Sequence, residues 1–173
     1  MFGIEQQIEK HIEEIMKLLE IEETASNKDT PRRIAKMYVN EVFKNRDNNL
    51  DNLNKQMTIF ENDGAREPIT MSGIKFNSMC EHHWLPFFGH VNVTYIPRDT
   101  IIGLSKIPRV IKFFSQKPQL QERLTKEIGE YLVSILDPEY LHVEVIAVHT
   151  CVMCRGAESD CDTTTHYTYE WRE

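Results

Sequence analysis

The sequence lacks the features that membrane-spanning and nucleic-acid-binding proteins require. No apolar run approaches the about 20 residues of a membrane helix, and 20 Lys and Arg are outnumbered by 27 Asp and Glu, for a net charge of −7. General affinity for nucleic acid depends on an excess of basic side chains. We therefore expect neither a membrane nor a nucleic acid as partner, while a local basic pocket for one small anion stays compatible with this charge.

Cysteine, glycine and proline are also scarce. The 173 residues include four cysteines, seven glycines and seven prolines. Four cysteines are too few for a disulfide scaffold in a chain long enough to bury its own core. The N-terminal stretch MFGIEQQIEKHIEEIMKLLE is charged throughout, unlike a signal peptide. We expect a cytoplasmic protein, and in a reducing compartment cysteines near histidines are better explained as metal ligands.

Two helices are predicted near the N-terminus. Apolar residues recur at helical spacing in 4–20, and again after Pro31, where Thr30 can cap the helix. The first helix either packs on its own domain or contacts another subunit. The following residues, 44–54, are polar and are predicted to form a loop. We divide the chain into an N-terminal helical segment, 1–55, and a second domain, 56–173.

The second domain is predicted to mix strands with two helical stretches. Short strand patterns occur in QMTIFE, 68–78, 90–97, 101–102, LHVEVIAVHTCV and the terminal run from Tyr167 to Trp171. Ser105 can cap a helix that Pro118 interrupts and that resumes to about residue 136. This order of elements predicts an α+β fold with a mainly antiparallel sheet.

The segment SMCEHHWLPFFGH, residues 78–90, concentrates metal-binding and titratable side chains. Cys80 and His83 have the C-x2-H spacing with which one turn of chain gives two ligands to one ion. This short motif is weak alone, but AVHTCVMCRG, further along the chain, supplies His149, Cys151 and Cys154. The alternative is that all of these residues are core thiols and hydrogen-bonded histidines.

Two kinds of metal site are compatible with these residues. With Cys80, His83, Cys151 and Cys154 as ligands, the site would be closed and structural. Without Cys154, a fourth position stays open to water, which zinc can activate near neutral pH. On a continuing strand, Cys151 would share a face with His149 and Cys154 would not. This geometry favours the open site, with His82 and His149 free for proton transfer.

Basic residues cluster at the starts of two predicted helices. Arg32, Arg33 and Lys36 follow Pro31. Lys106 and Arg109 follow Ser105, and Arg155 comes directly after the second cysteine segment. A helix N-terminus that carries basic side chains suits a polyphosphate. Each cluster alone is more often a solvated face, but together they suggest a small phosphorylated substrate.

The motifs SMCEHH, GLSKIPRVIKFFSQKPQLQERLT and AVHTCVMCRG, together with DTPRRIAKMY, resemble the GTP cyclohydrolase I family in order and spacing. The resemblance runs from about residue 28 to residue 166. It implies a tunnelling fold (T-fold), an antiparallel sheet with two long helices on one side. It also implies subunit contacts through 1–55 and a homo-oligomer, a decamer with active sites between subunits. The implied substrate is GTP, whose guanine ring is opened by water at C8, with release of formate and reclosure to 7,8-dihydroneopterin triphosphate.

The resemblance also assigns roles to individual residues. It implies that Zn²⁺ is held by Cys80, His83 and Cys151, and that His82 and His149 are catalytic. Glu122 corresponds to the carboxylate that recognises guanine, with Gln121 as a supporting contact. The triphosphate-binding positions correspond to Arg33, Lys36, Ser105, Lys106, Arg109 and Arg155. Without the resemblance, Glu122 would be expected to pair with Lys126 on the helix surface.

Two other functions and several details stay open at this point. The chain could be an inactive zinc-binding assembly protein of the same fold, or a related enzyme such as a nitrile reductase. Family members usually continue into a terminal helix beyond the TTT segment, whereas this sequence ends at Glu173, which leaves the size of the oligomer open. The product is shared by folate and 7-deazaguanine synthesis, and the sequence does not distinguish between these.

Overall fold

The chain divides into two compact units, residues 1–44 and 45–173. The structure is a computed structural model that describes residues 3–172. The boundary after residue 55 expected from the sequence stays a prediction. No helix within residues 3–172 is both long and apolar enough to cross a membrane.

The first unit is helical. It contains α1 (Ile4–Leu18), α2 (Thr30–Met37) and a short π-helical turn, η1 (Tyr38–Val42). The predicted helices at 4–20 and after Pro31 are therefore confirmed. Asn40 donates to Glu5 Oε1 at 2.9 Å, which links the end of the unit to α1. The expectation that Thr30 caps α2 was wrong, because Asp29 precedes the helix and Thr30 is its first residue.

The second unit is built on a five-stranded sheet in the order β5-β2-β3-β6-β7. Neighbouring strands are antiparallel except for the short β5, which runs parallel to β2. The strands are β2 (Ile69–Cys80), β3 (Pro86–Ile96), β5 (Pro118–Gln119), β6 (Tyr140–His149) and β7 (Asp162–Glu170). A separate pair joins β1 (Ile59–Glu61) to β4 (Thr100–Ile102).

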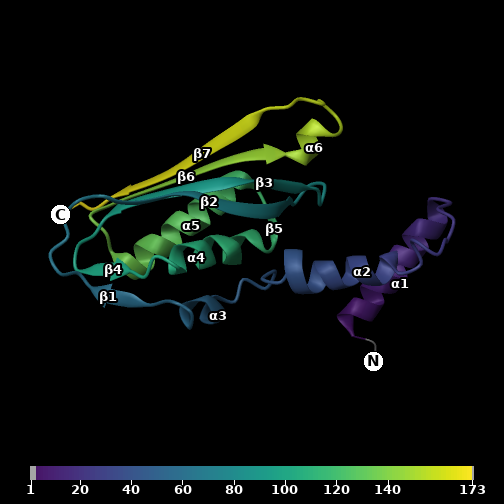
Figure 1. The fold of residues 1–173 in the computed structure, drawn as a ribbon, viewed down its shortest axis with the longest axis horizontal. Helices are drawn as coiled ribbons and strands as arrows, with labels where there is room; N and C mark the ends of the chain where they lie inside the picture. Colours follow the sequence, from purple (N-terminus) through teal and green to yellow (C-terminus); the bar gives the residue numbers. More distant parts are fainter. Residues whose placement is uncertain (1–2, 173) are drawn as a thin grey trace. The chain divides into compact units, whose positions relative to one another are not determined.

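One face of the sheet is covered by helices α4 (Lys106–Ser115) and α5 (Gln121–Leu136), as Figure 1 shows. The alternation predicted for residues 90–97 is confirmed, because Val91, Val93 and Tyr95 are buried. Leu124, Ile128 and Leu132 of α5 are fully buried in the same core. At about 1.5–3 kcal/mol for each buried side chain of this size, these layers supply much of the driving force for folding. The opposite face of the sheet carries polar residues such as Asn92, Thr94, His142 and Glu144, which alternate with the buried residues of β3 and β6.

Three local predictions differ from the structure. Residues 44–54 are not all loop, since α3 (Leu50–Asn54) forms there with Asn49 accepting from the Asp51 amide and with Leu53 buried. Pro118 does not restart a helix but begins β5. The strand predicted over residues 141–152 ends at His149, and the single helical turn α6 (Thr150–Met153) follows.

The close packing of α5 on β7 gives a stability prediction at Gly129. A Cβ at this position would lie 2.1 Å from Cδ1 of Tyr167, in the body of the ring rather than at its tip. Overpacking of this kind costs about 1–3 kcal/mol, whereas alanine gains about 1 kcal/mol over glycine inside a helix. Gly129→Ala is therefore expected to lower the free energy of unfolding. Urea unfolding at one fixed protein concentration measures this change.

The matched control for Gly129→Ala is the same substitution in a Tyr167→Ala background. Removing the ring removes the overlap, so alanine should there be neutral or stabilising. An equal loss of stability in both backgrounds would show that contact with Tyr167 is not the cause.

Candidate metal centre and nucleotide site

Three potential metal ligands come together where β2 ends and α6 begins. Ligand atoms of Cys80, His83 and Cys151 all lie within 4.8 Å of one another. Both cysteines are buried and His83 is exposed. The tight turn after β2 returns His83 to Cys80, because the Cys80 amide donates to Leu85 O at 2.8 Å and the Trp84 amide donates to Cys80 O at 2.8 Å.

Cys151 reaches this group by a different route from the one expected. The sequence argument placed Cys151 on the same strand face as His149. This was wrong, because the strand ends at His149 and Cys151 belongs to α6. The Thr150 hydroxyl donates to Pro86 O at 2.6 Å, which ties α6 to the start of β3. Cys154 is exposed, and the group of potential ligands found within residues 3–172 does not include it.

The chemistry of this group fits a soft divalent cation. Burial raises the pKa of the Cys151 thiol, and the neighbouring Cys80 raises it further, while Arg155 acts in the opposite sense. Two buried sulfurs side by side are therefore unfavourable as thiolates unless a cation compensates their charge. Two sulfurs and one imidazole form the kind of donor set that zinc prefers.

His149 is held in a fixed orientation beside the three ligands. Its ring stacks on Phe87 with centroids 4.7 Å apart and planes 2° apart. Its Nε2 lies 2.7 Å from Oε1 of Gln121. Burial lowers the pKa of His149, and the negative charge of Glu122 partly opposes this effect. The imidazole is therefore favoured in its neutral form.

Gln121 determines which nitrogen of His149 carries the proton. The Gln121 amide nitrogen donates to Val145 O at 3.0 Å and to Thr163 O at 2.8 Å. These two bonds leave the amide oxygen facing His149, and that oxygen can only accept. His149 Nε2 must then be protonated, so Nδ1 carries the lone pair of the neutral ring.

A cavity of about 410 Å³ joins these groups. Its lining residues are Cys80, His82, His83, Gln119, Leu120, Gln121, Glu122, His149, Cys151, Val152, Arg155 and Ala157. The three potential ligands, both candidate catalytic histidines and the carboxylate of Glu122 therefore share one cavity. Arg155 adds a cation, with Nη1 lying 3.1 Å from His83 Nε2.

The sequence of this chain is similar to that of a known protein family. Residues 8–172 match the sequence model described as GTP cyclohydrolase I. The chain belongs to the GTP cyclohydrolase I family. Its relatives named GTP cyclohydrolase 1 include proteins of Blochmanniella pennsylvanica (strain BPEN), 44% identical over 91% of this chain and 71% of that protein, and Shewanella denitrificans, 43% identical over 91% and 72%. A solved structure of the archaeosine synthase QueF-Like in the apo form covers 61% of this chain and 95% of its own at a TM-score of 0.44 and 17% identity, too slight a likeness to carry an argument.

Membership of the GTP cyclohydrolase I family confirms the resemblance and the α+β T-fold class expected from it. It also decides against the nitrile reductase alternative. The residues of the three quoted motifs lie within the matched range 8–172. The catalytic, metal-binding and substrate-binding roles of individual residues stay predictions.

Glu122 is free of the surface ion pair considered as its alternative. In residues 3–172, Lys126 pairs with Glu130 at 3.7 Å instead of Glu122. The Glu122 side chain is thus available to the cavity at the start of α5. Gln121, expected as a supporting contact for the substrate, has its side-chain amide engaged by two carbonyl groups and by His149.

The other predicted phosphate-binding residues do not line this cavity. Ser105, Lys106 and Arg109 lie together at the start of α4, where Ser105 occupies the N-cap position without a side-chain hydrogen bond to the helix. Arg109 donates to Gln56 Oε1 at 3.3 Å. Arg33 and Lys36 are exposed on α2, in the first unit.

Sequence reasoning missed a polar connection beneath the metal group. Glu81 forms an ion pair with Arg123. Arg123 also donates from Nε to Gln119 Oε1 at 2.9 Å, and the Glu81 amide donates to Gln119 O at 3.0 Å. The i, i+4 spacing of Gln119 and Arg123 was the only available signal.

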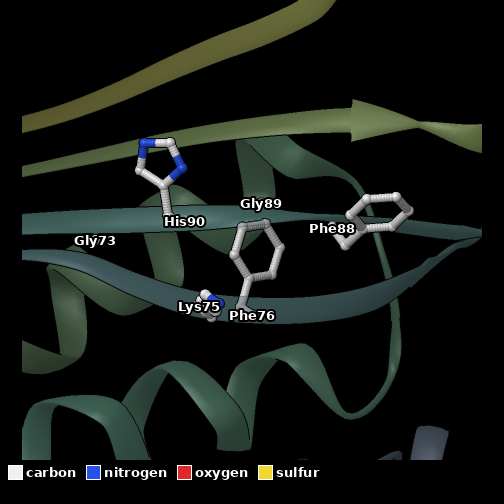
Figure 2. Close-up of a pocket in the computed structure, with 6 residues that line it drawn as sticks. All are labelled: Gly73, Lys75, Phe76, Phe88, Gly89 and His90. Carbon is white, nitrogen blue, oxygen red and sulfur yellow. The ribbon is translucent and has the colours of Figure 1, made fainter.

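A second hollow, of about 510 Å³, lies between β2 and β3. It is lined by Gly73, Lys75, Phe76, Phe88, Gly89 and His90 (Figure 2). In the register of β2 and β3, His90 lies opposite Lys75. None of the candidate site residues lines this hollow, so it is separate from the metal centre.

Proposed function

We propose that this chain is a zinc-dependent GTP cyclohydrolase I. Water opens the guanine ring of GTP at C8, that carbon leaves as formate, and the ring recloses to give 7,8-dihydroneopterin triphosphate. The observation that carries the proposal is the single cavity in which Cys80, His83 and Cys151 lie beside His82, His149 and Glu122. Family membership supports the substrate and the reaction.

Cys80, His83 and Cys151 would hold the zinc ion, which leaves a coordination position for water. When bound there, the ion supplies the Lewis acidity that makes water a nucleophile near neutral pH. The closed alternative would need Cys154 as a fourth ligand, and the exposure of Cys154 outside the group argues against it.

His149 and His82 would move protons during ring opening and reclosure. The lone pair on His149 Nδ1, set by Gln121, makes this atom the proton acceptor. His82 is exposed at the cavity and its ring centroid lies 6.2 Å from that of His83. Each such group typically contributes about 10²–10⁴-fold to the rate.

Glu122 would recognise guanine by accepting from N1–H and the exocyclic amine together, which adenine cannot satisfy. Glu122→Ala is therefore expected to lower kcat/KM for GTP by about 10⁴-fold while the zinc content stays unchanged. Steady-state kinetics and metal analysis of the same preparation test both parts. Glu130→Ala, on the exposed side of the same helix, is the matched control and should change neither value. Zinc loss from the Glu122 variant would contradict the assignment.

The triphosphate would be bound by Arg155 together with Arg33, Lys36, Ser105, Lys106 and Arg109. Several of these positions do not line the cavity of the second unit. A decameric assembly, in which neighbouring subunits complete each site, accounts for this. We propose that assembly, and a cytoplasmic location, on the strength of the family resemblance.

Product analysis tests the proposed function. The purified protein is incubated with GTP with and without a zinc chelator, and neopterin fluorescence is measured after oxidation and dephosphorylation. Fluorescent product without chelator, and none with it, is the expected result. Zinc-loaded protein that gives no product would favour the inactive assembly protein, and product formation that the chelator leaves unchanged would contradict the metal requirement.

A further inference from the structure

Two histidines that the proposed function does not use lie on the face of the sheet opposite α4 and α5. His142 and Glu144 alternate on β6 with the buried Val143 and Val145, so they face away from the core. In the register of β6 and β7, His142 pairs with Thr168 and Glu144 pairs with His166. The two histidines are therefore diagonal neighbours on the same face.

The two imidazole rings are close and nearly parallel. Their centroids are 5.4 Å apart and their planes differ by 29°. Two nitrogens that bind one ion at about 2.0–2.1 Å lie roughly 3–4 Å apart. Binding of one ion by both rings would require rotation of the two side chains until one nitrogen of each ring reaches that separation.

A hydroxyl lies at hydrogen-bond distance from one Nδ1 atom of the pair, and a carboxylate lies near the other. His142 Nδ1 lies 3.0 Å from Thr168 Oγ1, and His166 Nδ1 lies 3.9 Å from Glu144 Oε1. Glu144 is itself oriented, because its Oε2 accepts from Asn92 Nδ2 at 2.7 Å, and Asn92 Oδ1 accepts from the Gly73 amide at 2.8 Å. When Nδ1 of each ring is the protonated nitrogen, both Nε2 atoms carry lone pairs.

Histidines that bind metals usually donate their other ring N–H to a carboxylate or another oxygen. Thr168 Oγ1 lies at hydrogen-bond distance from His142 Nδ1, whereas the Glu144 carboxylate, 3.9 Å from His166 Nδ1, would have to move closer to accept from that ring. Imidazole pairs suit Zn²⁺, Ni²⁺ and Cu²⁺. We propose that His142 and His166 bind one divalent transition-metal ion through their Nε2 atoms, with Glu144 and Thr168 orienting the rings. Water would fill the other positions, which makes the site weaker than the cysteine site.

This second site is independent of the catalytic proposal. His142 precedes His149 by seven residues along β6, a separation of about 23 Å at about 3.3 Å per residue. No residue of the pair lines the cavity that contains Cys80. Occupation of the pair is therefore measurable without disturbing GTP turnover.

Calorimetric titration with Ni²⁺ tests the proposal. The protein is first loaded with zinc and freed of excess metal, so that the cysteine site is occupied. The unaltered protein should bind one further Ni²⁺ per chain, and His142→Ala and His166→Ala should each weaken this binding at least about tenfold. Glu144→Gln should weaken it less. His90→Ala, on the same face of β3, is the control and should bind as the unaltered protein does.

Electron paramagnetic resonance of bound Cu²⁺ gives a second readout. Hyperfine splitting from two nitrogens is expected in the unaltered protein and from one in either histidine variant. Circular dichroism and GTP turnover of the variants should stay unchanged. Ni²⁺ binding unaffected by both histidine substitutions, equal weakening in His90→Ala, or a one-nitrogen spectrum of the unaltered protein would each overturn the proposal, leaving His142 and His166 as a stacked pair only.

Discussion

Replacing Cys80 by serine is expected to remove both the bound zinc and the turnover of GTP. Cys80 is 6% exposed and contributes one of two sulfurs to the group. Serine keeps nearly the same shape, but its hydroxyl is a poor substitute for a thiolate toward zinc. The loss of metal affinity should exceed the about 10–100-fold that removal of a ligand's hydrogen-bonding partner costs. Metal content after gel filtration and product formation are measured on one preparation.

Cys154→Ser is the matched control for Cys80→Ser. Cys154 is an exposed thiol close to Cys151 in sequence but outside the potential ligands. The control should keep its zinc and its activity. Equal loss of metal from the two variants would mean that Cys154 completes a closed coordination sphere, and the water-based mechanism would then have no open position to use.

Replacing His82 by alanine should separate metal binding from catalysis. His82 neighbours the proposed ligand His83 in sequence, but the two ring centroids are 6.2 Å apart and His82 is outside the group of potential ligands. The variant should retain one zinc per site while kcat falls by about 10²–10⁴-fold. His90→Ala, in the same strand-turn region but lining a separate hollow, should leave kcat unchanged. If the His82 variant instead released its zinc, His82 would be a metal ligand, and His83 would be the candidate for proton transfer.

The sequence predicted the sheet and its core well, because burial leaves a periodic signal. Val91, Val93 and Tyr95 alternate with polar residues along β3, and the stripe of Leu124, Ile128 and Leu132 repeats at helical spacing along α5. Each pattern depends only on which face of the strand or helix packs against the core. These elements therefore appear in the structure close to where the sequence placed them.

The structure departs from the sequence predictions where a local hydrogen bond outweighs the hydrophobic pattern. Val and Ile continue through β6 toward Cys151, yet the strand ends at His149, where the Thr150 hydroxyl bonds to Pro86 O. The predicted strand face led to the same ligand group for the wrong reason. Similarly, the short α3 depends on the Asn49 cap and on burial of Leu53, neither of which an otherwise polar stretch reveals.

Most side-chain orientations in the site could not be predicted because they depend on partners distant in sequence. Gln121 was expected as a supporting contact for the substrate, and this role stays a prediction. The sequence did not indicate that its amide bonds to β6 and β7 and presents its oxygen to His149. Nothing in the letters QERL indicates which carbonyl groups will lie within reach. The same holds for Glu81 and Arg123, whose pairing needs the turn after β2 to meet the start of α5.

The proposed ligands come from two regions about 70 residues apart, which come together only when β2, β3 and β6 are paired. A chain that has not made these long-range pairings offers no preformed set of three donors, so affinity for the ion depends on the folded sheet. The binding free energy then adds to the stability of the assembled sheet. Zinc bound by the proposed ligands would therefore also stabilise the fold, and zinc-free protein should unfold at a lower temperature than zinc-loaded protein.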